Sequence, residues 1–192
     1  MLDLAAPIVD LGTGSLAGGY LLRVEVSEHR FVRFGRGGRA SRLTVERGEY
    51  LYVGSAWSQL ARHPLAARIA RHLTRSAVNR PHVLYGIWRD YVQTCGAHLH
   101  PPGVKRMFWH IDYLLDLDVA EVRQIVVARG GQSCEATVAA AVERAECARP
   151  LARGLGASDH RGHTHILQWS GHEDQWHGLL QRLAEEVTSW SK

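Results

Sequence analysis

The chain reads Gly-Gly-Tyr at residues 18–20 and, one hairpin later, Gly-Glu-Tyr-Leu-Tyr-Val-Gly-Ser at residues 48–55. Residues 19–26 alternate in part between apolar and polar side chains, and residues 49–53 are apolar and aromatic, so both segments predict strands. The arginine-rich segment between them holds too many glycines for a helix and predicts a further strand and a turn. Tyr20 and Tyr52 are therefore expected on neighbouring strands, each near a glycine.

A helix with one basic face is predicted directly after the second tyrosine strand, over residues 64–73. Pro64 suits a first helical turn, and leucines and an isoleucine spaced four apart form an apolar stripe. The basic side chains fall on another face at helical spacing: Arg68, Arg71, His72 and Arg75. On an isolated helix we would interpret such a face as solvated. Next to the two tyrosines it predicts a surface that handles phosphate.

The charge of the chain is unevenly distributed. Residues 1–106 hold 15 Lys and Arg against 7 Asp and Glu, whereas residues 107–192 hold 8 against 12. Nearly all of the positive charge comes from arginine, which binds phosphate through two parallel hydrogen bonds. A basic N-terminal half suits a polyanion such as nucleic acid, although a genome that favours arginine would leave the same bias.

Length and composition predict a single domain over residues 1–192. No apolar run reaches the roughly 18 residues that a membrane-spanning helix needs, and the N-terminus lacks the basic region of a signal peptide. The three cysteines are odd in number and widely spaced, which argues against a disulfide framework. We therefore expect a cytoplasmic protein with no membrane partner.

The remaining elements predict an α+β fold, in which a small, mostly antiparallel sheet of three to four strands is flanked by helices. Residues 76–106 resemble a helical insertion, with several prolines and histidines and a short helix near residues 83–91. The other elements expected are a buried strand at 121–128, a helix at 134–149, a strand at 166–169 and a C-terminal helix at about 171–190.

A phosphodiester nuclease needs a base for the attacking water, a cation for the phosphate and usually a metal ion held by a carboxylate. The tyrosines supply the base if nearby cations lower the pKa of a phenol, and Arg68 supplies the cation. One carboxylate is enough for Mg²⁺ that keeps most of its waters. Glu135, which opens a predicted helix, is favoured, and Glu146 is the alternative. Either residue could equally be an ordinary surface glutamate.

Histidines gather late in the chain, in a loop expected over residues 154–165. Four of these side chains have the composition of a metal site, although their spacing matches no standard zinc motif: Asp159, His160, His163 and His165. A loop that lines a nucleic-acid groove is the favoured interpretation, with Ser158 and His165 contacting substrate.

His110 and Asp112 lie two residues apart, so they would face one side of an extended segment. There they could hydrogen-bond each other and orient the site, with His110 close enough to substrate to bind it. A buried histidine satisfied by a neighbouring carboxylate is an equally good interpretation of the pair.

These motifs together resemble the GIY-YIG nuclease superfamily. The similarity is greatest to an uncharacterised branch, also found fused to endonuclease III-type glycosylases. That branch shows Gly-x-Tyr, Tyr-Val-Gly-Ser-Ala, an Arg-x-x-Arg-His helix and His-Ile-Asp-Tyr-Leu-Leu, which match residues 18–20, 52–56, 68–72 and 110–115. The later motifs depart from it: its Glu-Cys pair is reversed at residues 134–135, and two of its cysteines are replaced by His160 and Gly162.

The resemblance implies a GIY-YIG-like sheet in which Tyr20 and Tyr52 are active-site tyrosines. It also implies that Arg68 stabilises the charge of the transition state, that His72 assists, and that Glu135 binds Mg²⁺ or Mn²⁺. The basic helix face adds Arg71 and Arg75 as contacts to the substrate.

The sequence therefore predicts a metal-dependent endonuclease that cleaves DNA, with single-stranded or branched DNA favoured because no standard duplex-reading helix is visible. RNA is left open as a substrate, no small-molecule cofactor is expected, and the oligomeric state is undetermined. The alternatives are a catalytically silent nucleic-acid-binding module and a partner subunit of a DNA repair complex.

Overall fold

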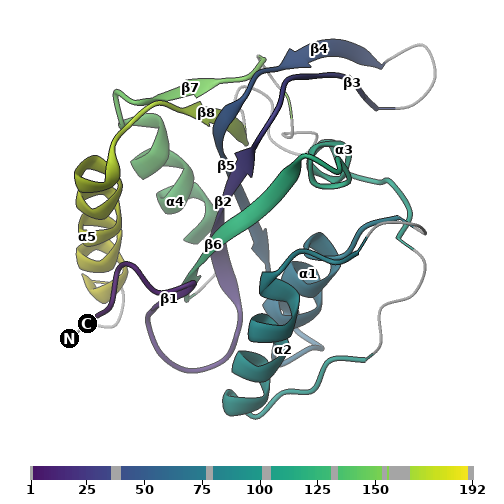
Figure 1. The fold of residues 1–192 in the computed structure, drawn as a ribbon. Helices are drawn as coiled ribbons and strands as arrows, with labels where there is room; N and C mark the ends of the chain where they lie inside the picture. Colours follow the sequence, from purple (N-terminus) through teal and green to yellow (C-terminus); the bar gives the residue numbers. More distant parts are fainter. Residues whose placement is uncertain are drawn as a thin grey trace.

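The computed structural model describes residues 2–35, 40–76, 80–100, 105–130, 134–152, 155 and 165–189. A mixed six-stranded sheet divides the molecule into two layers of helices (Figure 1). Its strands, in spatial order, are β1 (Ile8–Leu11), β6 (Ala120–Arg129), β2 (Gly18–Val26), β5 (Gly48–Ala56), β8 (Ile166–Trp169) and β7 (Ala148–Pro150). Only the β1–β6 pair is parallel; the other pairs in this sheet are antiparallel. The α+β class is confirmed.

The sheet is wider than the three to four strands expected from the sequence. The two additional strands lie at its edges, where β1 has four residues and β7 has three. Residues 148 and 149 were expected at the end of an alanine-rich helix, but that helix, α4 (Cys134–Glu143), ends earlier. Pairing with β8 makes the following segment a strand. Such short strands carry too few residues to show alternation.

The arginine-rich segment forms a separate hairpin of two strands, β3 (Arg30–Phe34) and β4 (Ser41–Val45). The segment was expected to form one strand and a turn, and it forms two strands. Residues 36–39, which connect them in sequence, lie outside the described part of the chain. The hairpin contacts α3 (His110–Leu115) through the ring of Phe34, whose centroid lies 6.4 Å from that of Tyr113.

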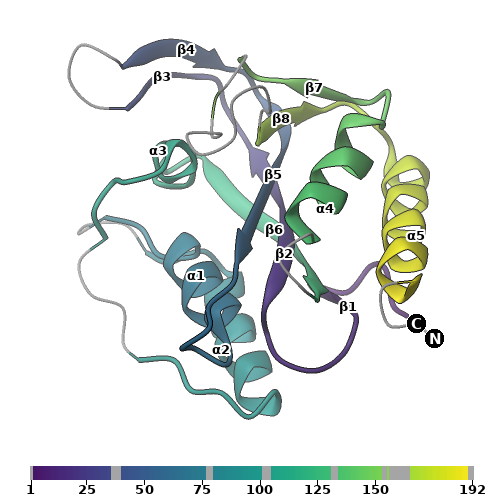
Figure 2. The same ribbon diagram turned by 180° about the vertical axis from the view of Figure 1, so that it is seen from behind.

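Helices cover both faces of the sheet, which creates two hydrophobic cores. On one face lie α1 (Pro64–His72), α2 (Leu84–Thr94) and α3, and on the other lie α4 and α5 (Glu173–Ser189), as Figure 2 shows from behind. Along β2 the side chains alternate between the cores: Tyr20 and Leu22 face α1–α3, whereas Leu21 faces α4 and α5. Trp88 of α2 is fully buried and donates a hydrogen bond to the carbonyl of Ala66 in α1 at 3.0 Å. Helix α2 is therefore part of the first core.

Two further observations bear on the expectations from composition. Cys95, Cys134 and Cys147 are all free thiols, as the absence of a disulfide framework requires. None of the helices in the described ranges is long and apolar enough to cross a membrane.

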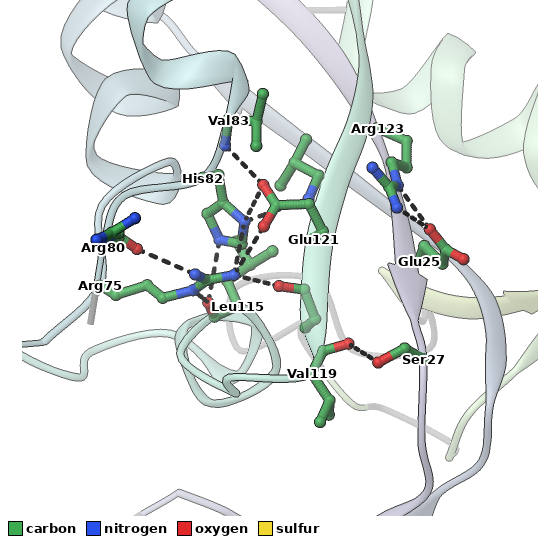
Figure 3. Close-up of polar contacts among 12 residues, drawn as sticks. Glu25, Ser27, Arg75, Arg80, His82, Val83, Leu115, Val119, Glu121 and Arg123 are labelled. Atoms are coloured by element: carbon green, nitrogen blue, oxygen red, sulfur yellow. Dashed lines mark hydrogen bonds and ion pairs between the residues drawn. The ribbon is translucent and has the colours of Figure 1, made fainter.

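A buried polar network anchors the loop after α1 to strand β6 (Figure 3). The Arg75 guanidinium donates to Glu121 at 3.1 Å and to the carbonyls of Arg80 and Ala120. His82 donates from Nε2 to the carbonyl of Leu115 at 3.0 Å and accepts at Nδ1 from the backbone of β6. The Arg75 side chain is only 8% exposed, so its charge is compensated almost entirely by protein groups.

Glu121→Ala is expected to lower the free energy of unfolding by about 3 kcal/mol, because it leaves the Arg75 charge buried without its carboxylate. Glu25→Ala provides the matched control on the neighbouring strand, since its ion pair with Arg123 is solvent-exposed at 42% and 56%. That control should cost less than about 1 kcal/mol. Urea unfolding of both variants measures the difference, and equal losses would contradict the structural role of the network.

Candidate active site

The two tyrosines lie on one face of the sheet, as expected. Tyr20 of β2 is paired with Gly54 of β5, and Tyr52 lies diagonally across from it, with ring centroids 6.0 Å apart. A methyl group on Gly54 would lie 2.4 Å from the Tyr20 hydroxyl oxygen and 2.5 Å from the carbon that bears it. The phenol of Tyr20 therefore lies across β5 only because residue 54 has no side chain.

His72 meets the tyrosines from the last turn of α1. Its Nε2 lies 2.7 Å from the Tyr20 hydroxyl, and its ring centroid lies 5.5 Å from that of Tyr52. The Nδ1 atom faces Asp112 Oδ1 at 3.7 Å, which is an electrostatic contact rather than a hydrogen bond. A proton on Nδ1 faces a carboxylate and leaves Nε2 as the acceptor for the phenol, so we assign this tautomer.

Asp112 of α3 is completely buried and is the last residue in the series of contacts that runs from Tyr20 through His72. It accepts two hydrogen bonds from Arg71, at 2.8 and 2.7 Å, and one each from the backbone N–H groups of Phe108 and Trp109 at 2.9 Å. Burial alone would raise its pKa, but these contacts and His72 hold the pKa of Asp112 well below its usual range. Asp112 is therefore a fixed negative charge beside His72.

The expected pairing of His110 with Asp112 does not occur. Both residues lie in the helix α3, where positions two apart point in different directions, and Asp112 turns to Arg71 and His72 instead. His110 begins the helix and is half-buried. Arg71 was expected to bind substrate, but its guanidinium is engaged by Asp112 and by the carbonyl of Arg106. Its position makes it a support for Asp112.

Arg68 lies one turn before His72 on α1 and is half-buried. Its guanidinium stacks on Trp109, with the central carbon 4.3 Å from the ring centroid. Its charge acts to lower the pKa of both Tyr20 and Tyr52, so it lies within electrostatic reach of both phenols. No hydrogen bond or ion pair within the described ranges occupies this guanidinium. Arg68 is thus the cation positioned to receive an anion.

Glu135 lies in the first turn of α4, on the other side of the sheet from the two tyrosines (Figure 2). At Gly19 an added methyl group would lie 3.0 Å from the backbone of Cys134, so the glycine allows the first turn of α4 to approach β2. Ser55, next to Gly54, donates a hydrogen bond to Glu135, and His165 Nδ1 lies 3.4 Å from the same carboxylate. Glu135 keeps 24% of its side chain exposed, so a ligand can reach it.

Glu146, the alternative carboxylate, is exposed and lies beyond the other end of α4. At a rise of 1.5 Å per residue, α4 carries the chain about 12 Å from Glu135 to its last residue, Glu143, and Glu146 follows three residues later. Only Glu135 is brought to the tyrosines. Its charge acts to raise the pKa of both phenols, which places it within electrostatic reach of them.

The tyrosines are not acidified, contrary to the expectation from their cationic neighbours. Burial raises the pKa of Tyr52 to about 12 and that of Tyr20 well above its ordinary value, and Arg68 offsets only part of this effect. Burial also lowers the pKa of His72 to about 4. At neutral pH the buried pair is therefore a neutral phenol that donates a hydrogen bond to a neutral imidazole.

Three further predicted residues have different outcomes. Arg75 follows the end of α1 and turns away from Arg68 into the network of Figure 3, so its position does not support contact with substrate. His165 is 7% exposed and lies beside Glu135. Ser158 lies outside the described residues, as do Asp159, His160 and His163. Among the residues that are described, no cluster of three or more His, Cys, Asp and Glu could hold a metal ion.

Ser55, Trp109 and the full role of Asp112 were missed by reasoning from the sequence. Ser55 directly follows Gly54 in the sequence. Because side chains alternate along a strand, the Ser55 side chain points to the sheet face opposite to the one that holds Tyr20, the residue paired with Gly54. Asp112 contacts Arg71, 41 residues earlier, and no local pattern could reveal that pair.

Gly54→Ala is expected to displace the Tyr20 ring and to lower the free energy of unfolding by about 2 kcal/mol, because the methyl group overlaps the phenol. Gly86→Ala in α2 is the matched control, since a methyl group there meets no atom within 4 Å. Replacing a helical glycine at such a site should stabilise the protein by about 0.5–1 kcal/mol. Urea unfolding compares them, and a stable Gly54→Ala protein would show that the ring lies elsewhere.

His72 is expected to stay neutral in NMR titrations of its ring nitrogens down to about pH 4, whereas an ordinary histidine is half protonated near pH 6.5. The unfolded chain takes up this proton first, so the free energy of unfolding should fall as the pH drops from about 6.5 to 4. Asp112→Asn should lower the pKa of His72 further, because the carboxylate favours the imidazolium. Protonation of wild-type His72 near pH 6.5 would refute the burial argument.

Comparison with known proteins places the chain in one family. The sequence model of the family described as "Domain of unknown function DUF123" matches residues 19–188, which include both tyrosines, α1, α3 and Glu135. No curated protein and no solved structure matches the chain. This protein is therefore a member of the DUF123 family.

Proposed function

We propose that this protein is a metal-dependent endonuclease that hydrolyses phosphodiester bonds in DNA. The observation that carries the proposal is the chain of contacts from Tyr20 through His72 to Asp112, which lies with Arg68 and Glu135 around one end of the β2–β5 pair. This set contains a route for a proton, a cation for a phosphate and an accessible carboxylate. The resemblance of its motifs to the GIY-YIG nucleases supports the same activity and a GIY-YIG-like fold.

Tyr20 and His72 together would accept the proton of the attacking water. Because the phenol is neutral, Tyr20 can take a proton only if it gives up its own, and His72 Nε2 is 2.7 Å away to receive it. The imidazolium formed in this way lies beside the Asp112 carboxylate, which stabilises it. The proton thus moves from water to Tyr20 and from Tyr20 to His72, while the new P–O bond forms and the bond to the leaving oxygen breaks. The leaving oxygen takes up a proton from solvent water, and His72 later returns its proton to solvent.

Arg68 would stabilise the additional negative charge that develops on the phosphoryl oxygens. Its stacking on Trp109 fixes the guanidinium before substrate arrives, so little order has to be gained during the reaction. Tyr52 is adjacent to both Tyr20 and His72. It would keep water away from this proton-transfer pair and donate a hydrogen bond from its hydroxyl to the phosphate.

Glu135 and the Ser55 hydroxyl offer oxygen ligands that suit Mg²⁺ or Mn²⁺, which keep several waters and need few protein ligands. Such an ion supplies Lewis-acid polarisation of the phosphate when it is bound. The partly exposed carboxylate and the nearby His165 favour this assignment over an ordinary surface glutamate. The free cysteines are compatible with a cytoplasmic location, which is part of the proposal.

Wild-type protein incubated with end-labelled single-stranded, branched and duplex DNA in Mg²⁺ or Mn²⁺ is expected to cut DNA. Glu135→Gln and Tyr20→Phe should each lower the cleavage rate by about 100-fold or more. Glu146→Gln is the matched control and should cut as wild type does, because Glu146 is exposed and lies beyond the C-terminal end of α4.

Equal cleavage by Glu135→Gln and Glu146→Gln would refute the metal assignment. A wild-type protein that retards DNA in a gel without cutting it, and does so less at higher salt, would be a binding module instead. Neither cutting nor retardation of DNA would contradict the proposal altogether, and a parallel series with labelled RNA would show whether RNA is the substrate.

A further inference from the structure

A pocket of about 690 Å³ lies on the other side of α1 from the tyrosines, between α1, α2 and the described residues of the 97–109 segment. Pockets of this size commonly hold small molecules or single groups of larger ligands. Three alanines of α1 line it, namely Ala66, Ala67 and Ala70, and their small side chains make the hollow. The pocket is distinct from the candidate active site, but Arg71 and Trp109 border both.

The charged side chains that line this pocket are all basic. Arg71, Lys105 and Arg106 line it together with three histidines, and no aspartate or glutamate is among its described lining residues. Lys105 is 7% exposed, and its ammonium group donates one hydrogen bond to the carbonyl of Thr74 at 2.7 Å. An ammonium group has three donors, so two remain for a ligand that carries carbonyl or phosphate oxygens.

Aromatic surface surrounds the opening. Phe108 exposes 77% of its side chain, which is unusual for so large an apolar group, and its ring centroid lies 5.0 Å from that of Trp109. Tyr85 of α2 lines the pocket as well. A ligand that is flat and aromatic, has oxygen acceptors on its edge and is joined to an anion would match these walls in shape and in charge.

We propose that this pocket binds an unpaired nucleobase of the strand whose phosphodiester bond is cut. The proposal rests on the proposed function, since it deepens the choice of substrate at the neighbouring site. The base would stack on Phe108 and Tyr85 and present its oxygens to Lys105, while Arg106 meets the adjoining phosphate. Trp109 links the pocket to the active site, because its ring contacts Phe108, His72 and Arg68.

This occupant predicts a preference for single-stranded or branched DNA. A base in a duplex must leave its stack and its partner before it can enter a pocket, which costs a few kcal/mol, whereas an unpaired base avoids most of that cost. The pocket would therefore select substrate by the accessibility of one base rather than by its identity.

The test measures binding separately from cleavage, in a Glu135→Gln background. The probe is a thymidine oligonucleotide with one 2-aminopurine, single-stranded or annealed to its complement, and the readouts are fluorescence anisotropy and quenching of the 2-aminopurine. We expect the single strand to bind about tenfold more tightly than the duplex, and quenching on binding. Phe108→Ala should weaken single-strand binding about tenfold and leave duplex binding unchanged.

Two further variants make the result decisive. Phe31→Ala is the matched control, because Phe31 is 83% exposed on the β3–β4 hairpin and lies outside the pocket, so it should bind as the parent does. Ala67→Leu fills the pocket from an exposed helical position and should weaken single-strand binding as Phe108→Ala does. Unchanged single-strand binding by both pocket variants, or tighter binding of duplex, would overturn the proposal.

The outcomes separate this proposal from the proposed function. If wild type cuts DNA but the pocket variants keep the parental preference, only the pocket assignment fails. If single strands bind in the pocket but wild type cuts nothing, the proposed function fails and the pocket remains a binding site for an unpaired base, without its link to cleavage. A final measurement uses the mononucleotide of 2-aminopurine as the ligand. Tight binding of this mononucleotide without binding of the oligonucleotide would identify the pocket as a site for free nucleotides and would contradict the proposal.

Discussion

The hydrogen bond between Tyr20 and His72 joins the central sheet to α1 at the point where the candidate site forms. It requires a tyrosine on β2, a glycine opposite it on β5 and a histidine in the last turn of α1. Both partners are buried, so loss of either would leave a polar atom without water to replace the bond. Asp112 of α3 lies 3.7 Å from the same imidazole and is held there by Arg71 and by the backbone of its own segment.

Burial also sets the chemistry that this bond can perform. It raises the pKa of Tyr20 and lowers that of His72, so the neutral forms of both groups coexist over the physiological range. In the proposed mechanism, a phenol in this state acts as a relay rather than as a free base. The accessible groups, Arg68 and Glu135, lie around the buried pair, which separates the site into a dry proton route and a surface that a phosphate can reach.

Much of the architecture could be predicted from the sequence because it depends on local patterns. Partial alternation predicted β2, β6 was predicted as a buried strand, and spacing predicted α1, α5 and a tyrosine pair on neighbouring strands. Edge strands β1 and β7 are too short for such patterns and exist through pairing with β6 and β8. Residues whose roles depend on distant partners were assigned less well: Arg75 lies past the end of its helix and pairs with Glu121, 46 residues away. The pKa values of the tyrosines could not be predicted because the sequence does not show burial.

The central claim is that Glu135 and the Tyr20–His72 pair belong to one metal-dependent site, and Mn²⁺ titration followed by NMR tests it most directly. Because bound Mn²⁺ broadens the signals of nearby nuclei, the account predicts that the resonances of Ser55, Glu135 and Tyr20 disappear first. Those of Glu146, beyond the other end of α4, should broaden only at a later stage of the titration. Broadening centred on Glu146, or spread evenly over the surface, would contradict the account.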